Sequence, residues 1–439
     1  MKFNYSVFFT APLVLIMLMD AMFLELLSPK NEVTQGIILA MMVKLTAVIS
    51  MGYCVYNIRY MSSYMRFAFI LTLLFVVGMV FESFLKYNTP LIYPHVFLKV
   101  FLFFYTFFIY TYYRKNEYLN LEHVIWFILI GFSLNVAIVN RESLSIAAFT
   151  SHDRGVYATS VYMIVIPFLY FMSKYLFKGG LFNMAMAFLV LFLIVFFQHR
   201  TVWITTAGIL IVYVLLVKFK SATEVNFKKL IPLGVTVFIL GIISSAFVFS
   251  MNPEIVEKFQ ENFSDIENMD SQGTGGWRYQ QFMSYWPFVV ENPIWGMRFE
   301  GFELPIQFYR DDINAPVFED GNGHFFHSFY MDVLFYIGTV GMLLFWLVKF
   351  YAIHRGFKLK HLTQEQIVLL SFITSGFVFG ISYILPYFFY AILGLTIAYL
   401  DSPAEENVSY LVDFAKRRKE RIRKLHHQVN NVPELITTS

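Results

Sequence analysis

The chain has 439 residues, of which 58% are hydrophobic and only 14% are charged, with a net charge of +3. Soluble globular proteins carry roughly 25% charged residues, so much of the charge that a water-exposed surface needs is missing. The 52 phenylalanines, set against 23 glycines and 14 prolines, exclude a disordered or fibrous protein. The single cysteine, Cys54, excludes an intrachain disulfide and a cysteine-based metal site. The composition therefore predicts a protein whose main solvent is the lipid bilayer.

Runs of about 20 mostly apolar residues, the length that crosses the hydrocarbon core, recur along the chain. They predict an all-α polytopic membrane protein with about twelve transmembrane helices. We expect residues 1–250 to hold helices one to nine, 251–327 to form one large external loop, 328–400 to hold the last three helices, and 401–439 to form a basic cytoplasmic tail. The predicted spans are Val7–Leu27, Thr34–Tyr56, Phe67–Leu85, Leu91–Tyr113, Val124–Val139, Val156–Phe177, Leu181–Phe197, Val202–Val217, Ile231–Ser250, Ser328–Ala352, Ile367–Leu385 and Pro386–Leu400.

Lysine and arginine concentrate in alternate loops and in the tail, where seven of them lie between Lys416 and Lys424. Because cytoplasmic loops hold the excess of positive charge, this pattern predicts that both termini are cytoplasmic. The first apolar run is too long for a signal peptide and has no small-residue cleavage site before Ser28, so we interpret it as a spanning helix. The basic tail is typical of a segment at the anionic inner leaflet and does not indicate nucleic-acid binding.

The segment 251–327 is the one sizeable polar stretch outside the tail, and it is acidic overall. Gln272–Gly276 predicts a flexible break because three of its five residues are glycine. Trp277–Val290 predicts a short amphipathic helix, which Asn292-Pro293 ends.

Five charged residues form the mid-span set of the predicted helices, where a charge is costly and marks a functional candidate by default. We favour the interpretation that these residues pair between helices, Asp20 with Lys44 for instance. The five are Asp20, Lys44, Glu82, Lys99 and Asp332.

The predicted external face carries a cationic cluster made of Arg200, Arg278, His324 and His327. Each residue alone is typical of a structural role, but together they supply permanent positive charge and a base that titrates near neutral pH. Arginine binds phosphate oxygens with two parallel hydrogen bonds, and histidine can take a proton from a sugar hydroxyl. The cluster therefore indicates a site for a diphosphate-linked lipid substrate.

The segment His327-Ser328, followed by Gly338 and Gly341, resembles a motif of the O-antigen ligase/polymerase superfamily. That pattern has a histidine and a small polar residue at the head of a span, with glycines about eleven and fourteen positions later.

Three further segments agree with the resemblance, which covers roughly Phe197–Val348. Gly276-Trp277-Arg278 is similar to the family's arginine-containing loop helix, Pro293–Gly296 to its Pro-x-x-Gly turn, and Arg200-Thr201 to an arginine element that opens a span. Ser328 stands where the family usually has asparagine, and Met297-Arg298 replaces the second glycine of the turn.

The resemblance implies a C-type glycosyltransferase fold in the bacterial inner membrane, acting without a cofactor, a metal or a nucleotide sugar. The implied donor is a glycan on undecaprenyl diphosphate, gripped by Arg200 and Arg278, while the catalytic residue His327 orients or deprotonates the acceptor hydroxyl. An apolar groove between spans would hold the polyprenyl chain. The implied partners are the glycan acceptor, the lipid bilayer, and the flippase and chain-length regulator of the same pathway. Secondary candidates for the site are His324, Arg298 and Arg310.

Three alternatives differ in product or class. We favour a polysaccharide polymerase, whose acceptor is a lipid-linked repeat unit, over a ligase, whose acceptor is a lipid A core or another surface molecule. A flippase for lipid-linked sugars would have inverted repeats and broken helices, and the sequence shows neither. A protein glycosyltransferase would have an acid in the first external loop, where Ser28–Val33 offers only Glu32.

Overall fold

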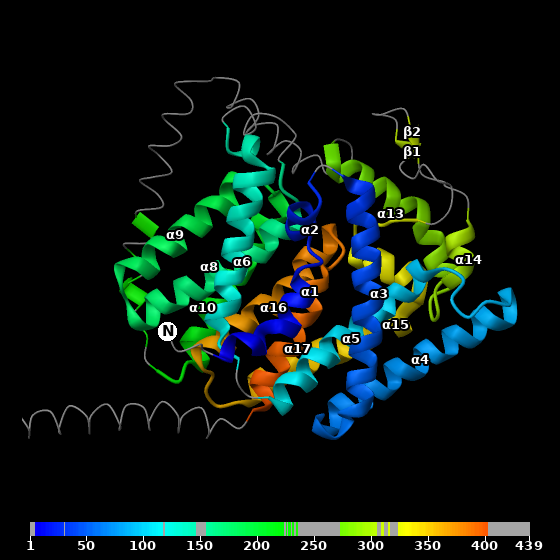
Figure 1. Ribbon diagram of the computed structural model, residues 1–439, viewed down its shortest axis with the longest axis horizontal. Helices are drawn as coiled ribbons and strands as arrows, with labels where there is room; N and C mark the ends of the chain where they lie inside the picture. The colour runs from blue at the N-terminus through cyan, green and yellow to red at the C-terminus, as the bar shows by residue number, and fades with distance from the viewer. Residues whose placement is uncertain are drawn as a thin grey trace, which may run out of the picture.

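The computed structural model describes residues 5–29, 31–116, 119–145, 155–223, 273–304 and 324–402, with short pieces between 225 and 235 and at 309–310 and 315–316. Nearly all of these residues are helical (Figure 1). The α-helices are α1 (Ala11–Met17), α2 (Ala21–Leu27), α3 (Glu32–Tyr56), α4 (Ser63–Tyr87), α5 (Pro94–Lys115), α6 (Leu121–Leu134), α8 (Ala158–Lys178), α9 (Leu181–Phe196), α10 (Arg200–Lys220), α13 (Gly273–Glu291), α14 (Arg298–Glu303), α15 (Phe329–Lys358), α16 (Gln364–Ser382) and α17 (Tyr387–Asp401). Short helical turns are Tyr5–Thr10, Ile58–Tyr60, Asn135–Val139, Arg141–Leu144 and Phe227–Lys229, and two two-residue strands, β1 (Tyr309–Arg310) and β2 (Ala315–Pro316), pair antiparallel.

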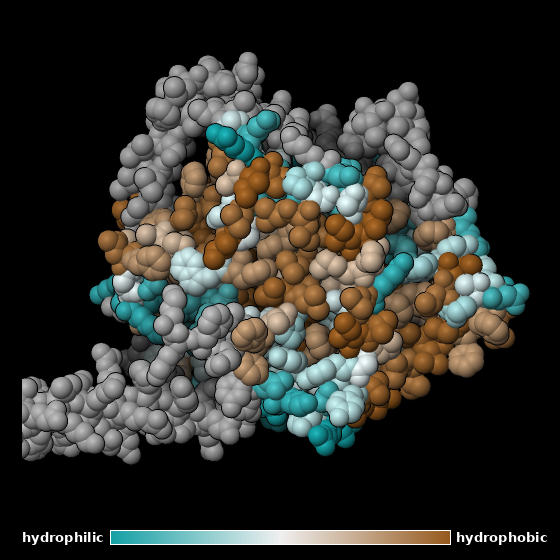
Figure 2. Space-filling view, viewed as in Figure 1, coloured by the Kyte–Doolittle hydropathy of each residue, from teal (hydrophilic) through white to brown (hydrophobic). Residues whose placement is uncertain are grey.

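The helices form a bundle in which α8, α9 and α10 lie on one side, α3 and α4 lie on the other, and α1, α5, α15, α16 and α17 lie between (Figure 1). The most apolar stretches of the central helix α5 and of α8 are each 83% buried, against 28% for α3 and 33% for α4 at the opposite side. Hydrophobic residues cover the middle of the face in Figure 2, and hydrophilic residues gather toward its upper and lower edges. The peripheral helices therefore present apolar side chains where a bilayer would surround them.

Within the described residues, eight helices are long and apolar enough to cross a membrane, or nine if one bent pair counts as a span. The prediction of an all-α polytopic membrane protein is confirmed, but the count of twelve is not reached. The predicted spans Leu181–Phe197 and Pro386–Leu400 form helices of only 16 and 15 residues. The predicted span Ile231–Ser250 and the tail lie almost wholly outside the described residues, and α13 already begins at Gly273, within the predicted flexible break.

The first predicted span is broken, because α1 and α2 meet at a bend of 94°. Asp20 causes the bend: its backbone is extended, with ψ of 148°, and its carboxylate caps α2 by accepting the Met22 amide hydrogen. The same carboxylate accepts the Ser160 hydroxyl hydrogen at 2.5 Å. The predicted pairing of Asp20 with Lys44 is therefore wrong, because the nearby hydrogen-bond donors already satisfy Asp20.

Other charged residues do pair between helices, as the sequence indicated. The Lys99 ammonium on α5 lies 2.6 Å from an Asp332 carboxylate oxygen on α15, and both side chains are almost fully buried. Glu82 on α4 forms an ion pair with Arg298 and a longer one, at 3.5 Å, with Lys86.

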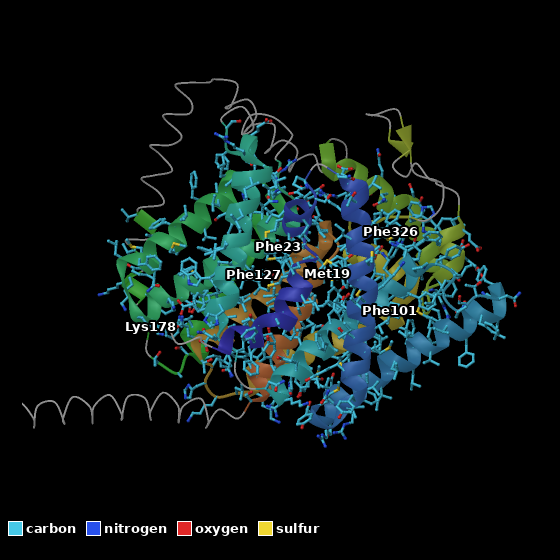
Figure 3. All side chains as sticks on the ribbon, viewed as in Figure 1. Met19, Phe23, Phe101, Phe127, Lys178 and Phe326 are labelled. Atoms are coloured by element: carbon cyan, nitrogen blue, oxygen red, sulfur yellow. The ribbon has the colours of Figure 1, made fainter. Side chains whose placement is uncertain are left out.

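Aromatic rings fill much of the interior (Figure 3). The rings of Phe23 on α2 and Phe127 on α6 stack with their centroids 4.8 Å apart, so the bent first segment is held against the α6 side of the bundle.

The start of α1 and the end of α17 lie at the same end of the bundle. The Tyr113 hydroxyl near the end of α5 donates to the Phe9 carbonyl at 2.6 Å, and Arg114 donates to the Asp401 carbonyl at 3.2 Å. Arg355, which closes α15, binds the Asp401 carboxylate at 2.8 Å. This end, which we call the Asp401 end, lies opposite the end where α15 begins. The side of the membrane that each end faces remains a prediction.

Candidate functional site

The site is built around the C-terminal end of α16, where residues 380–386 turn into α17; we call these residues the α16 corner. Tyr383 caps α16 with extended backbone, and Pro386 caps α17. The Arg278 guanidinium carbon lies 5.0 Å from the centroid of the Tyr383 ring. A cation at this distance from an aromatic face is attracted by the ring, so Tyr383 positions the Arg278 side chain at the corner.

His327 reaches the same corner through its neighbour Ser328. Ser328 caps α15, and its hydroxyl donates to the Gly380 carbonyl at 3.3 Å. Two residues later, the Tyr330 hydroxyl donates to the Phe377 carbonyl at 2.9 Å. These two bonds tie the start of α15 to the last turns of α16, and the exposed His327 directly precedes them.

Arg200 is the first residue of α10, and α10 runs antiparallel to α16. At the Asp401 end of this pair the Leu362 amide donates to the Lys220 carbonyl at 2.7 Å, and near the middle Gly208 faces Val378. Arg200 lies eight residues, roughly 12 Å, beyond Gly208. Tyr383 lies five residues, roughly 8 Å, beyond Val378 in the same direction. The start of α10 is therefore at the α16 corner.

The beginning of α8 completes the arrangement. The Tyr162 ring stacks on Phe379 with centroids 4.0 Å apart, and the His199 Nε2 atom forms a hydrogen bond of 2.8 Å with the Val156 carbonyl. Neither N-cap residue, Tyr157 for α8 or His199 for α10, caps its helix with its side chain. Since helix N-termini carry partial positive charge and amide donors, the starts of α8 and α10 add to the charge of Arg200.

A break in α15 fixes the loop that carries Arg278. Gly338 has φ of +62° and ψ of −165°, a conformation that only glycine adopts readily, and it interrupts the helix. The turn 293–297 fills the break: the Met297 amide donates to the Phe335 carbonyl at 2.7 Å, and the Thr339 amide donates to the Pro293 carbonyl at 2.9 Å. The Val340 amide donates to the Ile294 carbonyl at 3.1 Å. The turn Pro293–Gly296 and the Gly338–Gly341 segment, which are far apart in sequence, thus form one structural unit.

His324 is fully buried beneath α13. Its Nδ1 atom forms a hydrogen bond of 3.0 Å with the Tyr285 hydroxyl, and its backbone amide and carbonyl both bond to the Tyr336 hydroxyl at 2.9 Å. These contacts join α13 to α15, so the structure places His324 in the packing of the loop, whereas His327 is exposed at the corner.

The secondary arginines lie elsewhere. Arg298, in the Met297-Arg298 pair that replaces the second glycine of the resembled turn, has φ of +45°. Its guanidinium lies 5.2 Å from the Trp295 ring centroid and pairs with Glu82. It belongs to a network between α4 and α14, in which Lys86 also binds Glu300 at 2.9 Å. The side chain of Arg310 lies outside the described residues.

Sequence reasoning missed Tyr383 and His199. Tyr383 lay near the end of the predicted span Ile367–Leu385, and no motif marked it as a partner for Arg278. His199 was visible beside Arg200, but its bond to the start of α8 depends on tertiary structure. Within the described part of the chain, no three His, Cys, Asp or Glu side chains gather as a metal site requires.

Residues 185–346, a little over a third of the chain, match the family described as O-Antigen ligase. The matched segment contains Arg200, Arg278, His327, the turn 293–297 and Gly338. The match confirms the resemblance to the O-antigen ligase/polymerase superfamily, whose members are membrane glycosyltransferase-like enzymes. No curated protein matches the chain in sequence.

Proposed function

We propose that the protein is a polysaccharide polymerase that transfers a glycan from undecaprenyl diphosphate to a lipid-linked repeat unit on the outer face of the bacterial inner membrane. The proposal is supported by three contacts around the α16 corner: Arg278 lies against Tyr383, Ser328 beside His327 bonds to Gly380, and α10, which begins at Arg200, packs along α16 at Val378. The residues come from α13, from the start of α10 and from the segment before α15, which are distant in sequence. If each residue had only a structural role, the three would not need to lie near the same corner.

In the proposed reaction the acceptor hydroxyl oxygen attacks the anomeric carbon of the donor glycan. The bond from that carbon to the diphosphate oxygen breaks, and undecaprenyl diphosphate leaves with the bonding electron pair. Arg200 and Arg278 stabilise the negative charge on the leaving diphosphate, helped by the positive ends of α8 and α10. His327, exposed next to the corner, takes the proton from the acceptor hydroxyl.

A ligase remains the second candidate, because the family that matches residues 185–346 is described as O-Antigen ligase. Both enzymes break the same bond and differ in the acceptor, which contacts variable loops. A strain that lacks the gene distinguishes them. Loss of a polymerase leaves single repeat units on the surface acceptor, whereas loss of a ligase leaves full-length chains on the undecaprenyl carrier.

A flippase is less well supported, although the described residues contain the broken helices that the sequence did not reveal. The break at Gly338 is filled by the protein's own turn 293–297, and the bend at Asp20 is satisfied by Met22 and Ser160. In transporters such breaks expose backbone groups to substrate or ions, and here the backbone and side chains of the chain itself occupy them.

Complementation of the deletion strain tests the proposal. We expect Arg200→Ala and Arg278→Ala to lower surface-glycan formation by roughly 100- to 1,000-fold, the loss typical of removing one group that stabilises transition-state charge. Arg→Lys variants are expected to rescue only in part, because an ammonium cannot form the paired hydrogen bonds of a guanidinium. Arg59→Ala, an exposed arginine outside the corner, is the matched control. Full activity of both corner variants at normal protein levels would contradict the proposal.

A further inference from the structure

Helix α13 (Gly273–Glu291) buries one face against the rest of the chain. Three side chains on this face are at most 5% exposed: Gln281, Tyr285 and Val289. The Tyr285 hydroxyl and the His324 Nδ1 atom share a hydrogen bond of 3.0 Å. The Gln281 amide donates to the Phe325 carbonyl at 3.3 Å. These contacts fix the rotation of α13 about its own axis and so determine which side chains it exposes.

The rest of the circumference of α13 is exposed and divides into an apolar face and a polar face. The apolar face, which we call the apolar stripe, carries five large side chains that are 39–59% exposed: Tyr279, Phe282, Met283, Trp286 and Val290. They recur every three to four residues, the spacing at which side chains share one side of an α-helix. The polar face lies beside the stripe and carries Gln280, Ser284, Pro287 and Glu291. A contiguous row of exposed apolar side chains marks an interaction surface.

The apolar stripe continues beyond the end of α13 into the turn 293–297. Ile294 and Trp295 are 57% and 49% exposed. The Trp295 ring stacks on the Phe75 ring of α4 with centroids 6.2 Å apart. Phe75 is twelve residues from each end of α4, which is long and apolar enough to cross a membrane. The stripe therefore ends beside the middle of a candidate span, at a level where the surroundings are hydrocarbon.

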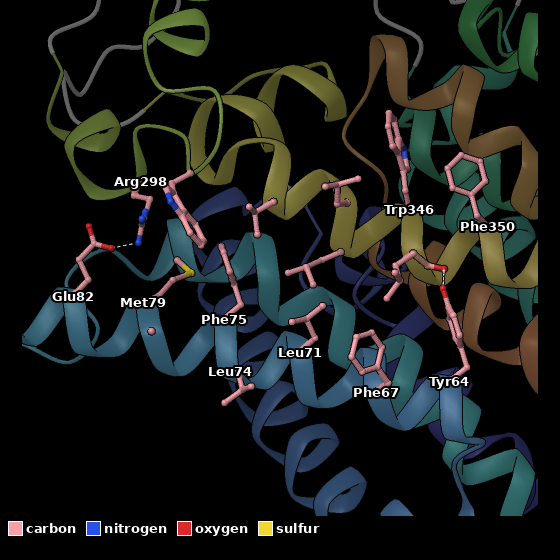
Figure 4. Close-up of a pocket in the computed structure, with 16 residues that line it drawn as sticks. Tyr64, Phe67, Leu71, Leu74, Phe75, Met79, Glu82, Arg298, Trp346 and Phe350 are labelled. Carbon is pink, nitrogen blue, oxygen red and sulfur yellow. Dashed lines mark hydrogen bonds and ion pairs between the residues drawn. The ribbon is translucent and has the colours of Figure 1, made fainter.

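The surface around Trp295 is apolar and exposed. Trp295 lines an apolar groove of about 940 Å³ between α4 and α15 (Figure 4). Leu74 on α4 and Leu343 on α15 line the same groove and are 61% and 59% exposed. Leucines exposed on two candidate spans face lipid chains, which are as apolar as leucine itself. The apolar stripe and the lipid-facing surface of the spans are thus continuous.

The chemistry of the apolar stripe favours lipid over carbohydrate. The stripe holds no charged side chain, and its hydrogen-bonding groups are the Tyr279 hydroxyl and the Trp286 indole N–H. A sugar ring presents several hydroxyls that need partners, and the amide and carboxylate of α13 that could bind them, Gln280 and Glu291, lie on the polar face. Tyrosine and tryptophan gather at the membrane–water interface, because their rings are apolar and carry one polar group.

We infer that α13 is an interfacial helix whose apolar stripe lies in the lipid leaflet on the side of the α16 corner. Its polar face contacts water, and its third face docks on α15 and on the segment before it. The partner of the stripe is the lipid surface itself. Helices of this kind lie in the plane of the interface, with the apolar face roughly 5–10 Å into the boundary between headgroups and acyl chains. Neither the stripe nor its lipid partner depends on the proposed function.

Anchoring of α13 in the leaflet has a consequence for Arg278, which directly precedes Tyr279. The guanidinium of Arg278 is held near the level of the lipid headgroups, with the Tyr383 ring on one side. The diphosphate of a lipid-linked substrate lies at the same level. On the proposed function, the bilayer therefore helps to position Arg278 for its substrate.

Spin labelling tests the inference on the full-length protein in liposomes of phosphatidylethanolamine and phosphatidylglycerol. Single cysteines are placed in a Cys54→Ser background and labelled with a nitroxide. Met283→Cys and Val290→Cys lie on the apolar stripe. Gln280→Cys and Glu291→Cys, exposed on the polar face of the same helix, are the matched controls. Power saturation then compares access of oxygen, which concentrates in lipid, with access of a nickel chelate, which stays in water.

Oxygen access is expected to exceed nickel access severalfold at Met283→Cys and Val290→Cys, and the order is expected to reverse at the two controls. Arg278→Ala is expected to leave this pattern unchanged. Equal nickel access on both faces would place α13 in water and overturn the inference. Protection of the stripe from both reagents would also overturn it, because a second copy of the chain or another protein would then cover the stripe.

The consequence for Arg278 is tested by glycan formation in the deletion strain. Met283→Asp combined with Val290→Asp puts two carboxylates on the stripe, and Gln280→Asp combined with Ser284→Asp puts two on the polar face. The first pair is expected to lower glycan formation roughly tenfold, because a charge is costly in the bilayer, and the second pair to preserve it. Equal activity of the two pairs would overturn the positioning of Arg278 by the bilayer. Full activity of Arg278→Ala with an intact accessibility pattern would contradict the proposed function and support the interfacial helix.

Discussion

Gly338→Ala is the substitution that probes most deeply how the loop is held on the bundle. A Cβ atom at Gly338 would lie 2.4 Å from the Ile294 carbonyl oxygen and 2.5 Å from the Gly296 amide nitrogen. Both are backbone atoms of the turn 293–297, so rotation of a side chain cannot relieve the contact. The turn must leave the break in α15, and the loop helix α13 that carries Arg278 loses one of its anchors on α15.

The magnitude follows from the backbone conformation and from the bonds that are lost. The conformation of Gly338 costs another residue about 1–3 kcal/mol. Expelling the turn breaks the hydrogen bonds at Phe335, Thr339 and Val340, each contributing about 0.5–1.5 kcal/mol. The sum is roughly 3–7 kcal/mol, a large part of the 5–15 kcal/mol that separates folded from unfolded domains.

The loss of stability is measured by thermal unfolding of the detergent-purified protein, monitored by size exclusion. Glycan formation in the deletion strain is measured in parallel. Gly52→Ala, which meets nothing within 4 Å, is the control and is expected to leave stability unchanged or slightly raised. Gly296→Ala acts on the other side of the same contact, so the double variant is expected to lose less than the sum of the two single losses. A Gly338→Ala protein with wild-type stability and activity, or strict additivity with Gly296→Ala, would refute the docking of the turn.

Three further predictions follow from buried and exposed charges. Lys99→Met alone is expected to destabilise the protein by about 3–5 kcal/mol, because it leaves the Asp332 carboxylate buried without its partner. Adding Asp332→Leu is expected to restore much of the lost stability, as measured by thermal unfolding. A double variant as unstable as the single one would contradict this. His327→Ala is expected to abolish glycan transfer at normal protein levels, whereas His324→Ala is expected to reduce the amount of folded protein and spare the activity of the remainder; equal specific activity of the two variants would contradict the assignment. Lys349 is buried, with its ammonium 3.4 Å from the Phe377 ring centroid, and it has no hydrogen-bond partner among the described residues. Lys349→Met is therefore expected to keep or raise the melting temperature. A marked fall would show that the cation stabilises the fold.

The long spans could be predicted from the sequence because the bilayer leaves little choice. A run such as Thr34–Tyr56 must satisfy all its backbone groups internally, and a helix does so; α3 occupies Glu32–Tyr56. The segment Trp277–Val290 was recognisable for a related reason, since its aromatic residues need a partner surface and Pro293 prevents continuation. Lys99 and Asp332 could be recognised in the sequence as charges inside predicted spans. Because an unpaired charge there is costly, pairing between the two helices was the favoured expectation.

The breaks could not be predicted, because each depends on contacts between distant segments. Gly338 stands in an apolar run that reads as continuous helix, and only the turn 293–297 makes its interruption stable. Asp20 suggested an ion pair with Lys44, but Ser160, 140 residues away, donates to it instead. The candidate site shows the same limit: Arg278 was evident as a cation beside the membrane, whereas Tyr383, which positions it, had no motif of its own.

The central claim is that Arg200 and Arg278 hold a lipid-linked diphosphate at the α16 corner, and equilibrium binding of undecaprenyl diphosphate to the purified protein in nanodiscs tests it most directly. Each arginine contributes hydrogen bonds to a charged group, of about 1.5–3 kcal/mol, so Arg200→Ala and Arg278→Ala are each predicted to weaken binding by roughly 10- to 100-fold, with Arg59→Ala unchanged. Equal affinity of the wild type and both corner variants for undecaprenyl diphosphate would contradict the account.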